Sequence, residues 1–255
     1  MRIAIVGYGK MGRMIREKAI LMGHTVSAII DPIVELPEVT DKSLSVYALE
    51  DSDVVIDFSS PKGVVDNIIF YSHCGVPAVI GTTGWLDQLP FIESMTEGDQ
   101  TSIMYSGNFS IGVAVFLKTV GAISSLMDRI DDYDVAITET HHTAKLDSPS
   151  GTAVMIANEV MKNLSRKTRP LYGNAEERIN PEELQVSSVR VGKVPGIHEV
   201  VFDSAYDTIT LTHSARSREG FAVGAIRAAS WLIGRRGIFN MDDFLDDFLK
   251  GENDD

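Results

Sequence analysis

A short stretch near the middle of the chain combines a proton donor with groups that bind anions. Its residues are His141, His142, Lys145, Ser150, Gly151 and Thr152. Histidine is the side chain best suited to give or take a proton near neutral pH. Lysine offers a positive charge to a carboxylate, and a Ser-Gly-Thr helix start offers backbone N–H groups, hydroxyls and the positive end of the helix dipole. The stretch therefore predicts a small anionic substrate that is held by two carboxylates beside a proton donor.

Each of these residues also has an ordinary explanation. A histidine in a loop is more often a surface residue than a catalyst, and Ser150 or Thr152 taken alone is most simply a helix N-cap. A metal site at His141 and His142 is disfavoured, because adjacent residues on an extended chain point to opposite faces. A proton donor that coincides with two anion anchors just past a strand favours an active site without a metal. We expect a histidine of this stretch to be the proton donor of the site and Lys145 to bind a substrate carboxylate.

A glycine-rich segment follows the first apolar run of the chain. It contains Gly7, Gly9, Lys10, Met11 and Gly12 in a G-x-G-x-x-G spacing. Glycines let the backbone turn tightly after a strand and approach a pyrophosphate, which then sits at the N-terminus of the next helix. Asp31 ends the next strand, nineteen residues after Gly12, where a carboxylate can accept hydrogen bonds from the adenosine ribose. The alternative is a tight turn and a surface acid, but the combined context favours dinucleotide binding.

The charge of Asp31 bears on the choice of cofactor. A carboxylate at this position repels the 2′-phosphate of NADP, and Pro32 leaves no arginine next to it to hold that phosphate. Lys10 and Arg13 lie near the loop and could compensate in part. We therefore expect NAD(H) as the cofactor, with NADP(H) as a second candidate.

Three further polar segments follow strand-like runs, at residues 57–61, 81–84 and 106–110. Ligands of doubly wound sheets bind at the carboxyl ends of the strands, so these segments are candidates for the nicotinamide end of the cofactor. The candidate residues are Phe58, Ser59, Gly81, Thr82, Thr83, Ser106, Asn108 and Phe109. Two phenylalanines could flank a flat ring, and the glycine allows close backbone approach. Ordinary βα turns have a similar composition, so each segment alone is equally well explained as a turn.

The elements that must position these residues follow two patterns, and the first occupies the N-terminal half. Short apolar runs span residues 3–6, 26–30, 54–56, 78–80 and 102–105. They alternate with helix-like stretches such as residues 11–22 and 61–71. Fully apolar short runs are typical of strands buried on both faces, and alternation with helices predicts a Rossmann-type doubly wound parallel sheet.

The pattern changes near residue 110, where we place a domain boundary. A long apolar helix is expected at residues 111–127, and another begins near Gly151. Strand-like runs without regular intervening helices span residues 134–140, 186–191, 199–202 and 208–212. This succession predicts an α+β domain with an antiparallel or mixed sheet. His198 and His213 lie in or beside these runs, and we expect structural roles for both, although either could line the site.

The remaining segments are less regular. Residues 165–183 are rich in charge, proline and asparagine, which predicts an excursion over the surface. Helices are expected at residues 219–233 and 241–249, and the tail at residues 251–255 is expected to be frayed.

Composition excludes several classes of protein. The chain has 255 residues and a net charge of −13, which disfavours binding to nucleic acid or to an anionic membrane. Hydrophobic residues make up 44% of it, enough for a sizeable core, yet no apolar run approaches the roughly 18–20 residues that span a bilayer. The N-terminal apolar run is too short for a secretory signal, and the lone Cys74 excludes an internal disulfide. We expect a soluble, cytoplasmic protein of one or two domains.

Taken together, the motifs resemble those of the 4-hydroxy-tetrahydrodipicolinate reductase family, the bacterial dihydrodipicolinate reductases. The matching motifs are Gly7-x-Gly9-x-x-Gly12, Asp57-Phe58-Ser59, Gly81-Thr82-Thr83-Gly84, Asn108-Phe109-Ser110 and Glu139-x-His141-His142-x-x-Lys145-x-Asp147-x-Pro149-Ser150-Gly151-Thr152. The last is highly specific, whereas the glycine loop is not. The resemblance continues to the Arg218-x-x-Phe221-x-x-Gly224-Ala225 segment and Trp231, so it covers nearly the whole chain.

The resemblance implies NAD(P)H-dependent reduction of (2S,4S)-4-hydroxy-2,3,4,5-tetrahydrodipicolinate to 2,3,4,5-tetrahydrodipicolinate with loss of water, in the diaminopimelate route to lysine. It implies that His141 and Lys145 are the catalytic residues, with His141 as the general acid. The residues that it implies for the substrate carboxylates are His142, Lys145, Ser150, Gly151 and Thr152. The residues that it implies for the carboxamide side of the nicotinamide are Gly81, Thr82 and Thr83, with Phe58, Asn108 and Phe109 around them.

The resemblance also implies a domain organisation and an assembly. Residues 218–255 would return to the dinucleotide-binding domain of residues 1–110, so that residues 111–217 form an inserted substrate-binding and tetramerisation domain. The chain would assemble as a homotetramer through that insertion and act on a small dicarboxylate substrate.

The sequence departs from the family pattern in three places. The glycine loop has one residue fewer than the commoner Gly-x-x-Gly-x-x-Gly form, Ser148 stands where alanine is usual, and Pro32 removes a basic residue often linked to NADPH use. Two alternatives remain beside the family reading. One is another Rossmann dehydrogenase that acts on a small acid, and the other is a non-catalytic NAD-binding sensor.

Overall fold

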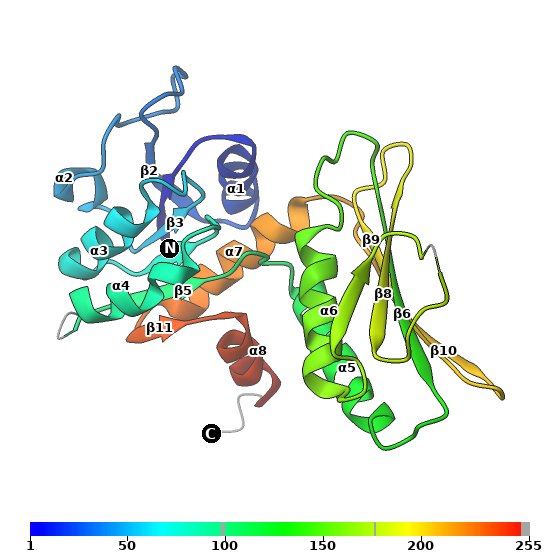
Figure 1. Cartoon of the computed structure of the whole chain (residues 1–255). Coiled ribbons are helices and arrows are strands. Elements are labelled where there is room, and N and C mark those ends of the chain that lie inside the picture. Colours follow the sequence, from blue (N-terminus) through cyan, green and yellow to red (C-terminus); the bar gives the residue numbers. More distant parts are fainter. Residues whose placement is uncertain (98–99, 176, 251–255) are drawn as a thin grey trace. The chain divides into compact units, whose positions relative to one another are not determined.

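The structure, a computed structural model, describes residues 1–97, 100–175 and 177–250. These residues form two compact units (Figure 1). The first unit contains Met1–Ile111 together with Glu219 and the residues after it, and the second is Gly112–Arg218. The tail at residues 251–255, for which the sequence predicts fraying, lies outside the described residues.

The first unit is built on a six-stranded sheet in which every pairing is parallel. The strands run in the order β11-β5-β4-β3-β1-β2. Their bounds are β1 Arg2–Val6, β2 Thr25–Ile30, β3 Val54–Asp57, β4 Ala78–Ile80, β5 Ser102–Tyr105 and β11 Gly237–Phe239. Val54, Val55 and Ile56 have no exposed surface, as expected for a strand covered on both faces. The Rossmann-type sheet predicted from the apolar runs is confirmed, but the short β11 gave no such signal.

Helices lie on both faces of this sheet (Figure 1). Their bounds are α1 Lys10–Leu21, α2 Val46–Leu49, α3 Val64–Cys74, α4 Leu89–Met95, α7 Glu219–Leu232 and α8 Met241–Lys250, with a 3₁₀ turn, η1, at Leu86–Gln88. Figure 1 shows α2, α3 and α4 on one side of the sheet and α1 and α7, which pack against each other, on the other. The helix predicted at residues 61–71 is α3, which begins three residues later and ends where Gly75 adopts a left-handed conformation with φ of 65°.

The order of the strands brings three loops to one place. β1 lies between β2 and β3, so the chain leaves β1 in one direction along the sheet and later continues in the other. In such sheets a ligand crevice opens outside the carboxyl ends of the strands at this switch point. The segments that follow β1, β2 and β3 are the glycine loop, Asp31 and Phe58 with Ser59.

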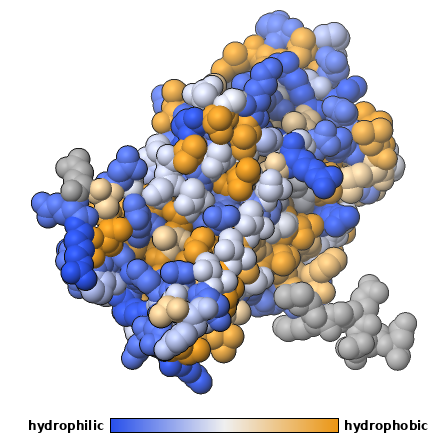
Figure 2. Space-filling model, turned by 90° about the vertical axis from the view of Figure 1, so that its right-hand side faces the viewer, coloured by the Kyte–Doolittle hydropathy of each residue, from blue (hydrophilic) through white to orange (hydrophobic). Residues whose placement is uncertain are grey.

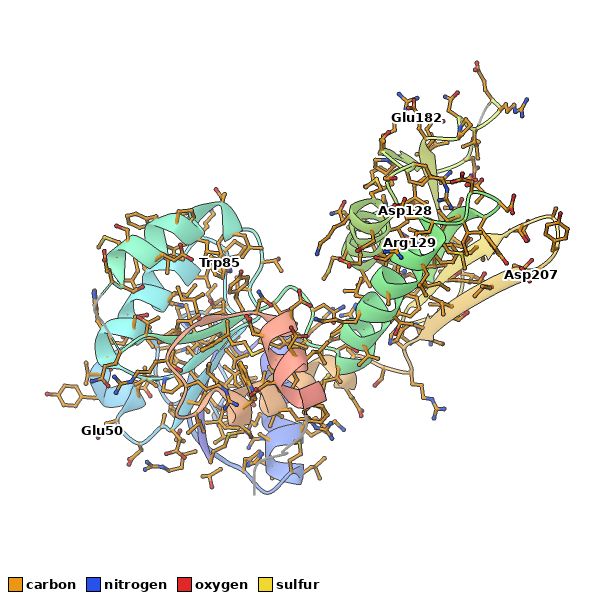
Figure 3. All side chains as sticks on the ribbon, turned by 90° about the horizontal axis from the view of Figure 1, so that it is seen from below. Glu50, Trp85, Asp128, Arg129, Glu182 and Asp207 are labelled. Atoms are coloured by element: carbon orange, nitrogen blue, oxygen red, sulfur yellow. The ribbon has the colours of Figure 1, made fainter. Side chains whose placement is uncertain are left out.

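The second unit contains a five-stranded mixed sheet in the order β10-β9-β6-β8-β7. The bounds are β6 Asp134–His141, β7 Arg169–Tyr172, β8 Glu183–Arg190, β9 Ile197–Asp203 and β10 Thr208–Ser214. β6 pairs parallel with β8 and antiparallel with β9. Asp207 lies at the tip of the β9–β10 hairpin and Glu182 lies just before β8 (Figure 3). The predicted α+β unit with a mixed sheet is confirmed.

Two helices cover one face of this sheet, α5 (Ile111–Met127) and α6 (Gly151–Asn163). Their apolar residues, such as Val120 and Ile156, share a buried core with alternate strand residues such as Ile137, Val186 and Val200. The residues in between face away from the helices. That opposite face carries half-exposed or exposed residues, among them Thr138, Thr140, Gln185, Ser187, Thr210 and Thr212.

One sequence prediction for this unit needs correction. Residues 165–183 are not a simple surface excursion, because β7 lies within them and pairs with β8. Lys167 is only 3% exposed, and its Nζ donates to the Glu183 carbonyl at 2.8 Å. Four residues of this segment, Arg169–Tyr172, form a short edge strand that backbone pairing with β8 orders, and the charged and polar residues around it hide it in the sequence.

Two surface properties complete the description. Within the described part of the chain, none of the helices has the length and hydropathy needed to cross a membrane. The face shown in Figure 2 carries hydrophobic residues in small groups between hydrophilic ones.

Candidate active site

A pocket of about 530 Å³ opens at the switch point of the first unit. Five of the predicted cofactor residues line it, namely Gly7, Gly9, Asp31, Phe58 and Ser59. Lys10, Met11 and Gly12 do not line it and instead form the first turn of α1. Its other lining residues include Ser60, which lies in the predicted 57–61 segment, and Lys42, Ser43, Leu44 and Asn67, which the sequence analysis missed. The missed residues come from a long loop and from a helix, which no short motif marks.

Close backbone contacts require glycine at two positions of the loop, Gly7 and Gly12. Gly7 has φ of 87°, and a Cβ added to it would lie 2.4 Å from the carbonyl oxygen of Phe58. A Cβ on Gly12 would lie 2.1 Å from the carbonyl oxygen of Gly7. Gly9 is the N-cap of α1 and provides no side-chain cap. The first backbone N–H groups of α1 therefore follow directly after Gly9, which lines the pocket. A pyrophosphate needs such N–H groups as hydrogen-bond donors.

Asp31 is more enclosed than the sequence analysis expected. Its carboxylate accepts hydrogen bonds from the backbone N–H groups of Tyr8 at 2.7 Å, Ile33 at 2.8 Å and Val34 at 2.8 Å. Burial alone would raise the pKa of Asp31, but these backbone hydrogen bonds outweigh it and hold the pKa below its usual value. Asp31 is thus ionised, and its charge is shared with three donors of the protein and lies near Lys42.

A second carboxylate organises the loops that follow β3 and β4. Asp57 has no exposed surface. It accepts hydrogen bonds from Ser59 N at 2.9 Å, Asn67 Nδ2 at 3.0 Å, Tyr71 Oη at 2.8 Å and Thr82 Oγ1 at 3.2 Å. Two of these partners, Ser59 and Thr82, are predicted cofactor residues. Asp57 therefore holds two of the predicted cofactor loops to one buried point.

The predicted nicotinamide residues from separate loops meet around Phe58. A Cβ on Gly81 would lie 2.1 Å from Cζ of Phe58, so the ring lies directly against the glycine. The Phe58 and Phe109 rings are 6.2 Å apart at an interplanar angle of 58°. A Cβ on Gly107 would lie 3.5 Å from Cγ2 of Thr83, which places the 106–110 segment beside the 81–84 segment.

The 106–110 segment is fixed by its own hydrogen bonds. Ser106 Oγ accepts from Asn108 N at 3.0 Å and donates to the Asn108 carbonyl at 2.8 Å. Asn108 Oδ1 accepts from Ser110 N at 2.9 Å. Asn108 and Phe109 are buried, and Phe109 also packs where Gly224 of α7 leaves room, since a Cβ there would lie 1.7 Å from its carbonyl oxygen.

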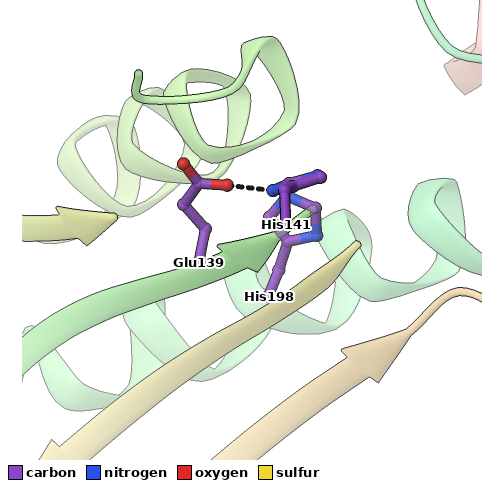
Figure 4. Close-up of side chains that lie close together, drawn as sticks. All are labelled: Glu139, His141 and His198. Carbon is purple, nitrogen blue, oxygen red and sulfur yellow. Dashed lines mark ion pairs between the residues drawn. The ribbon is translucent and has the colours of Figure 1, made fainter. Parts of the chain in front are cut away.

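In the second unit, a buried acid and a histidine share one face of β6 (Figure 4). Glu139 and His141 are two residues apart, so their side chains point to the same side of the strand. His141 Nδ1 forms an ion pair with Glu139 Oε2, and Arg190 Nη2 donates to Glu139 Oε1 at 2.8 Å. Glu139 has no exposed surface and His141 is 7% exposed. His141, the general acid of the sequence prediction, therefore lies in a buried network of charged side chains.

His198 completes this cluster through strand register. It pairs with Glu139 across β6 and β9, and with His213 across β9 and β10. Its ring lies edge-on to the His141 ring with the centroids 5.2 Å apart, and its Nε2 is 3.1 Å from Ser150 Oγ. Burial, together with the neighbouring charge of His141, lowers the pKa of His198 to about 4. His198 is therefore neutral near pH 7.

The predicted anion anchors lie in the segment that follows β6. Ser150 is the N-cap of α6, and its Oγ accepts from Ala153 N at 3.1 Å. Lys145 Nζ donates to both carboxylate oxygens of Asp147 at 2.8 Å. His142 and Thr152 are half-buried and Gly151 is exposed. The cationic anchor thus already holds a carboxylate, that of the chain itself.

The histidine cluster also raises the question of a metal ion. Among the described residues, Glu139, His141 and His198 form a group whose potential ligand atoms lie within 4.8 Å of one another. This group differs from the His141 and His142 pair weighed from the sequence. The Arg190 guanidinium beside Glu139 adds a positive charge that disfavours a cation there. The contacts are better explained as a hydrogen-bonded acid–histidine network.

The fold and the pocket together define a class of protein, the Rossmann-type proteins with a ligand crevice at the switch point of a parallel sheet. The chain belongs to the dihydrodipicolinate reductase family. Two family models match it, "Dihydrodipicolinate reductase, N-terminus" over residues 1–109 and "Dihydrodipicolinate reductase, C-terminus" over residues 112–245. The resemblance seen in the sequence motifs is confirmed.

Individual relatives agree with this assignment. A 4-hydroxy-tetrahydrodipicolinate reductase of Christiangramia forsetii is 37% identical over 98% of this chain and 100% of its own length. One from Staphylococcus aureus is 32% identical over 95% of this chain and 99% of its own length. The dipicolinate-bound dihydrodipicolinate reductase of Paenisporosarcina sp. TG-14 shares the fold, with a TM-score of 0.77, 23% identity and coverage of 94% of this chain and 97% of that chain.

Proposed function

We propose that this chain reduces (2S,4S)-4-hydroxy-2,3,4,5-tetrahydrodipicolinate to 2,3,4,5-tetrahydrodipicolinate with loss of water, in the diaminopimelate route to lysine. The observation that carries the proposal is the match over 98% of the chain to a relative named for this reaction. The buried Glu139–His141 pair supports it, because a reductase of an unsaturated ring needs a proton donor as well as a hydride.

The first unit would hold the cofactor. Gly7, Gly9 and the N-terminus of α1 would bind the pyrophosphate, and Asp31 would face the adenosine ribose. The residues proposed around the nicotinamide are Phe58, Ser59, Gly81, Thr82, Thr83, Ser106, Asn108 and Phe109. When bound, a reduced pyridine nucleotide would supply the hydride for C4 of the unsaturated imine that remains after the 4-hydroxyl group has left as water. The buried Phe109 ring and the half-buried Phe58 ring beside it would help to keep water from that end of the site.

The second unit would supply the proton and the charges. His141 would protonate C3 as the general acid. His142, Lys145, Ser150, Gly151 and Thr152 would hold the two substrate carboxylates. In this proposal a substrate carboxylate replaces Asp147 at Lys145, because both carboxylates use the same ammonium group.

We propose NADH as the preferred hydride donor and NADPH as a weaker one. The carboxylate of Asp31 disfavours a 2′-phosphate. Two observations limit this preference, since three backbone N–H groups already share that charge and Lys42 lines the same pocket. A basic side chain in this position can pair with a 2′-phosphate.

A homotetramer in the cytoplasm is part of the same proposal. The face of the second sheet turned away from α5 and α6 is rich in threonine and other half-exposed side chains, which suits a contact between copies. Light scattering coupled to gel filtration measures the assembly, and a mass of one chain would contradict it.

The reaction is tested by coupling the purified protein to the synthase that condenses pyruvate with aspartate semialdehyde. Rapid loss of NADH absorbance that depends on both precursors is expected, with a parallel run for NADPH. Protein that binds NADH but does not oxidise it in this assay would favour another small-acid dehydrogenase or a sensor.

A further inference from the structure

We infer that Glu139 is the positioning residue of the proton donor: its buried carboxylate holds Nδ1 of His141, so that Nε2 is the atom left to deliver the proton. The inference deepens the proposed function and rests on it for the identity of the reaction. The arrangement of the two side chains stands on the structure itself.

Glu139 is fixed from several sides. It shares a strand face with His141, and its Oε1 accepts from Arg190 Nη2 at 2.8 Å and from Ser150 N at 3.3 Å. Arg190 is the residue of β8 that lies opposite His141 in the sheet. Arg190 Nη2 also donates to the Asp147 carbonyl at 2.7 Å, which ties the loop containing Lys145 to the same guanidinium. The carboxylate therefore cannot rotate away from His141 without breaking these contacts.

The opposite edge of the His141 ring, which carries Nε2, faces residue 196. Glycine stands at position 196, and a Cβ there would lie 2.9 Å from Nε2. The edge-on ring of His198 lies 5.2 Å away between centroids. With Nδ1 held by Glu139 and no side chain at residue 196, Nε2 is the nitrogen that remains available to a substrate. A carboxylate that accepts from one ring nitrogen selects the tautomer and stabilises the charged imidazolium.

Charge explains why this pairing matters for a general acid. Burial lowers the pKa of His141, and the charges of Lys145 and Arg190 lower it further. Glu139 acts in the opposite direction through both its charge and its hydrogen bond. His198 faces the ring from β9, and its own low pKa keeps it neutral near pH 7. The carboxylate is thus the group in this set that favours the protonated, acid-competent form of His141.

The experiment compares E139Q with wild-type protein in two measurements. The first is the titration of His141 in the free protein by NMR of the imidazole C–H groups, assigned with H141Q; the chain has only six histidines. The second is the pH profile of kcat/KM in the reductase assay. Glutamine keeps the shape of the side chain and removes its charge. We expect the pKa of His141 to fall, the basic limb of the profile to move to lower pH, and kcat/KM at pH 7 to drop about tenfold or more.

Controls separate positioning from folding. E182Q removes an exposed carboxylate from the same unit (Figure 3), and its titration and profile are expected to match wild type. E139D, which keeps the charge, is expected to retain a basic limb between those of wild type and E139Q. Activity that falls in E139Q with an unchanged His141 titration and pH profile would overturn the inference and leave a purely structural role. If the NMR shift is found but wild type has no reductase activity, the pair stands and the proposed reaction fails.

Discussion

The hydroxyl of Tyr71 donates a hydrogen bond of 2.8 Å to Oδ2 of Asp57, and neither residue has any exposed surface. The two residues link the C-terminal half of α3 to the carboxyl end of β3. Burial and the Asp57 charge raise the pKa of Tyr71 well above its usual value, so the phenol remains a donor. Through Ser59 N and Thr82 Oγ1, the same carboxylate orders the loop that contains Phe58 and the loop that contains Gly81, against which the Phe58 ring lies.

Replacing Tyr71 with phenylalanine removes this donor and keeps the packing of the ring. A buried carboxylate that loses one partner costs roughly 1–3 kcal/mol of folding stability, measured by urea unfolding. Looser loops should also weaken NADH binding about fivefold, equivalent to about 1 kcal/mol. Tyr47, which is 83% exposed, supplies the matched control as Y47F, with no change expected in either quantity. An unchanged NADH affinity in Y71F would show that Asp57 does not order the cofactor loops.

His198 predicts a pH dependence of stability. Its pKa is about 4 in the folded state and 6.5 as the reference value. The unfolded chain therefore binds a proton first as the pH falls below 6.5, and the stability present above that pH is lost as the pH approaches 4. The loss amounts to about 3 kcal/mol. In H198Q, the free energy of unfolding should fall by about 3 kcal/mol less than in wild type across this pH window. Parallel pH curves for the two proteins would refute this assignment.

Replacing Lys42 is expected to change the preference between NADPH and NADH. Lys42 lines the same pocket as Asp31, and its Nζ donates to the Val34 carbonyl at 2.8 Å. If it pairs with a 2′-phosphate, K42M should weaken NADPH binding about tenfold and leave NADH binding nearly unchanged, because only NADPH carries that phosphate. Fluorescence titration of the two nucleotides measures both constants without turnover. K162M, an exposed lysine of the second unit, is the control. Equal losses for both nucleotides would mean that Lys42 binds a part they share.

Much of the fold follows from the apolar pattern of the sequence. The predicted helix at residues 111–127 has the bounds Ile111–Met127 in the structure, because apolar residues recur along the whole stretch. The strands β1, β3 and β4 read as continuous apolar runs because both of their faces are covered. β7, β11 and α4 were missed, since short or polar elements are ordered by their neighbours rather than by their own composition.

The candidate site was harder to predict, for a related reason. Glu139 could have been found, because a residue two positions before His141 on a strand must share its face. Arg190 and His198 reach the same cluster only through the register of β6 with β8 and β9. Local spacing contains no information on that register, nor on the path that brings Lys42 back to the end of β2.

The last prediction follows from the separate roles proposed for His141 and Lys145. H141Q removes the general acid, so kcat should fall about 10²–10⁴-fold. NADH affinity should be retained, because the substitution removes no group that binds the cofactor. K145A removes the partner of a substrate carboxylate, so kcat should fall and KM should rise together. D147N offers a comparison at the same position, because it weakens the competing internal ion pair that now occupies Lys145. Its KM should be equal to that of wild type or lower. Loss of NADH binding in H141Q and K145A would place both residues at the cofactor instead and would contradict the assignment of the acid to the second unit.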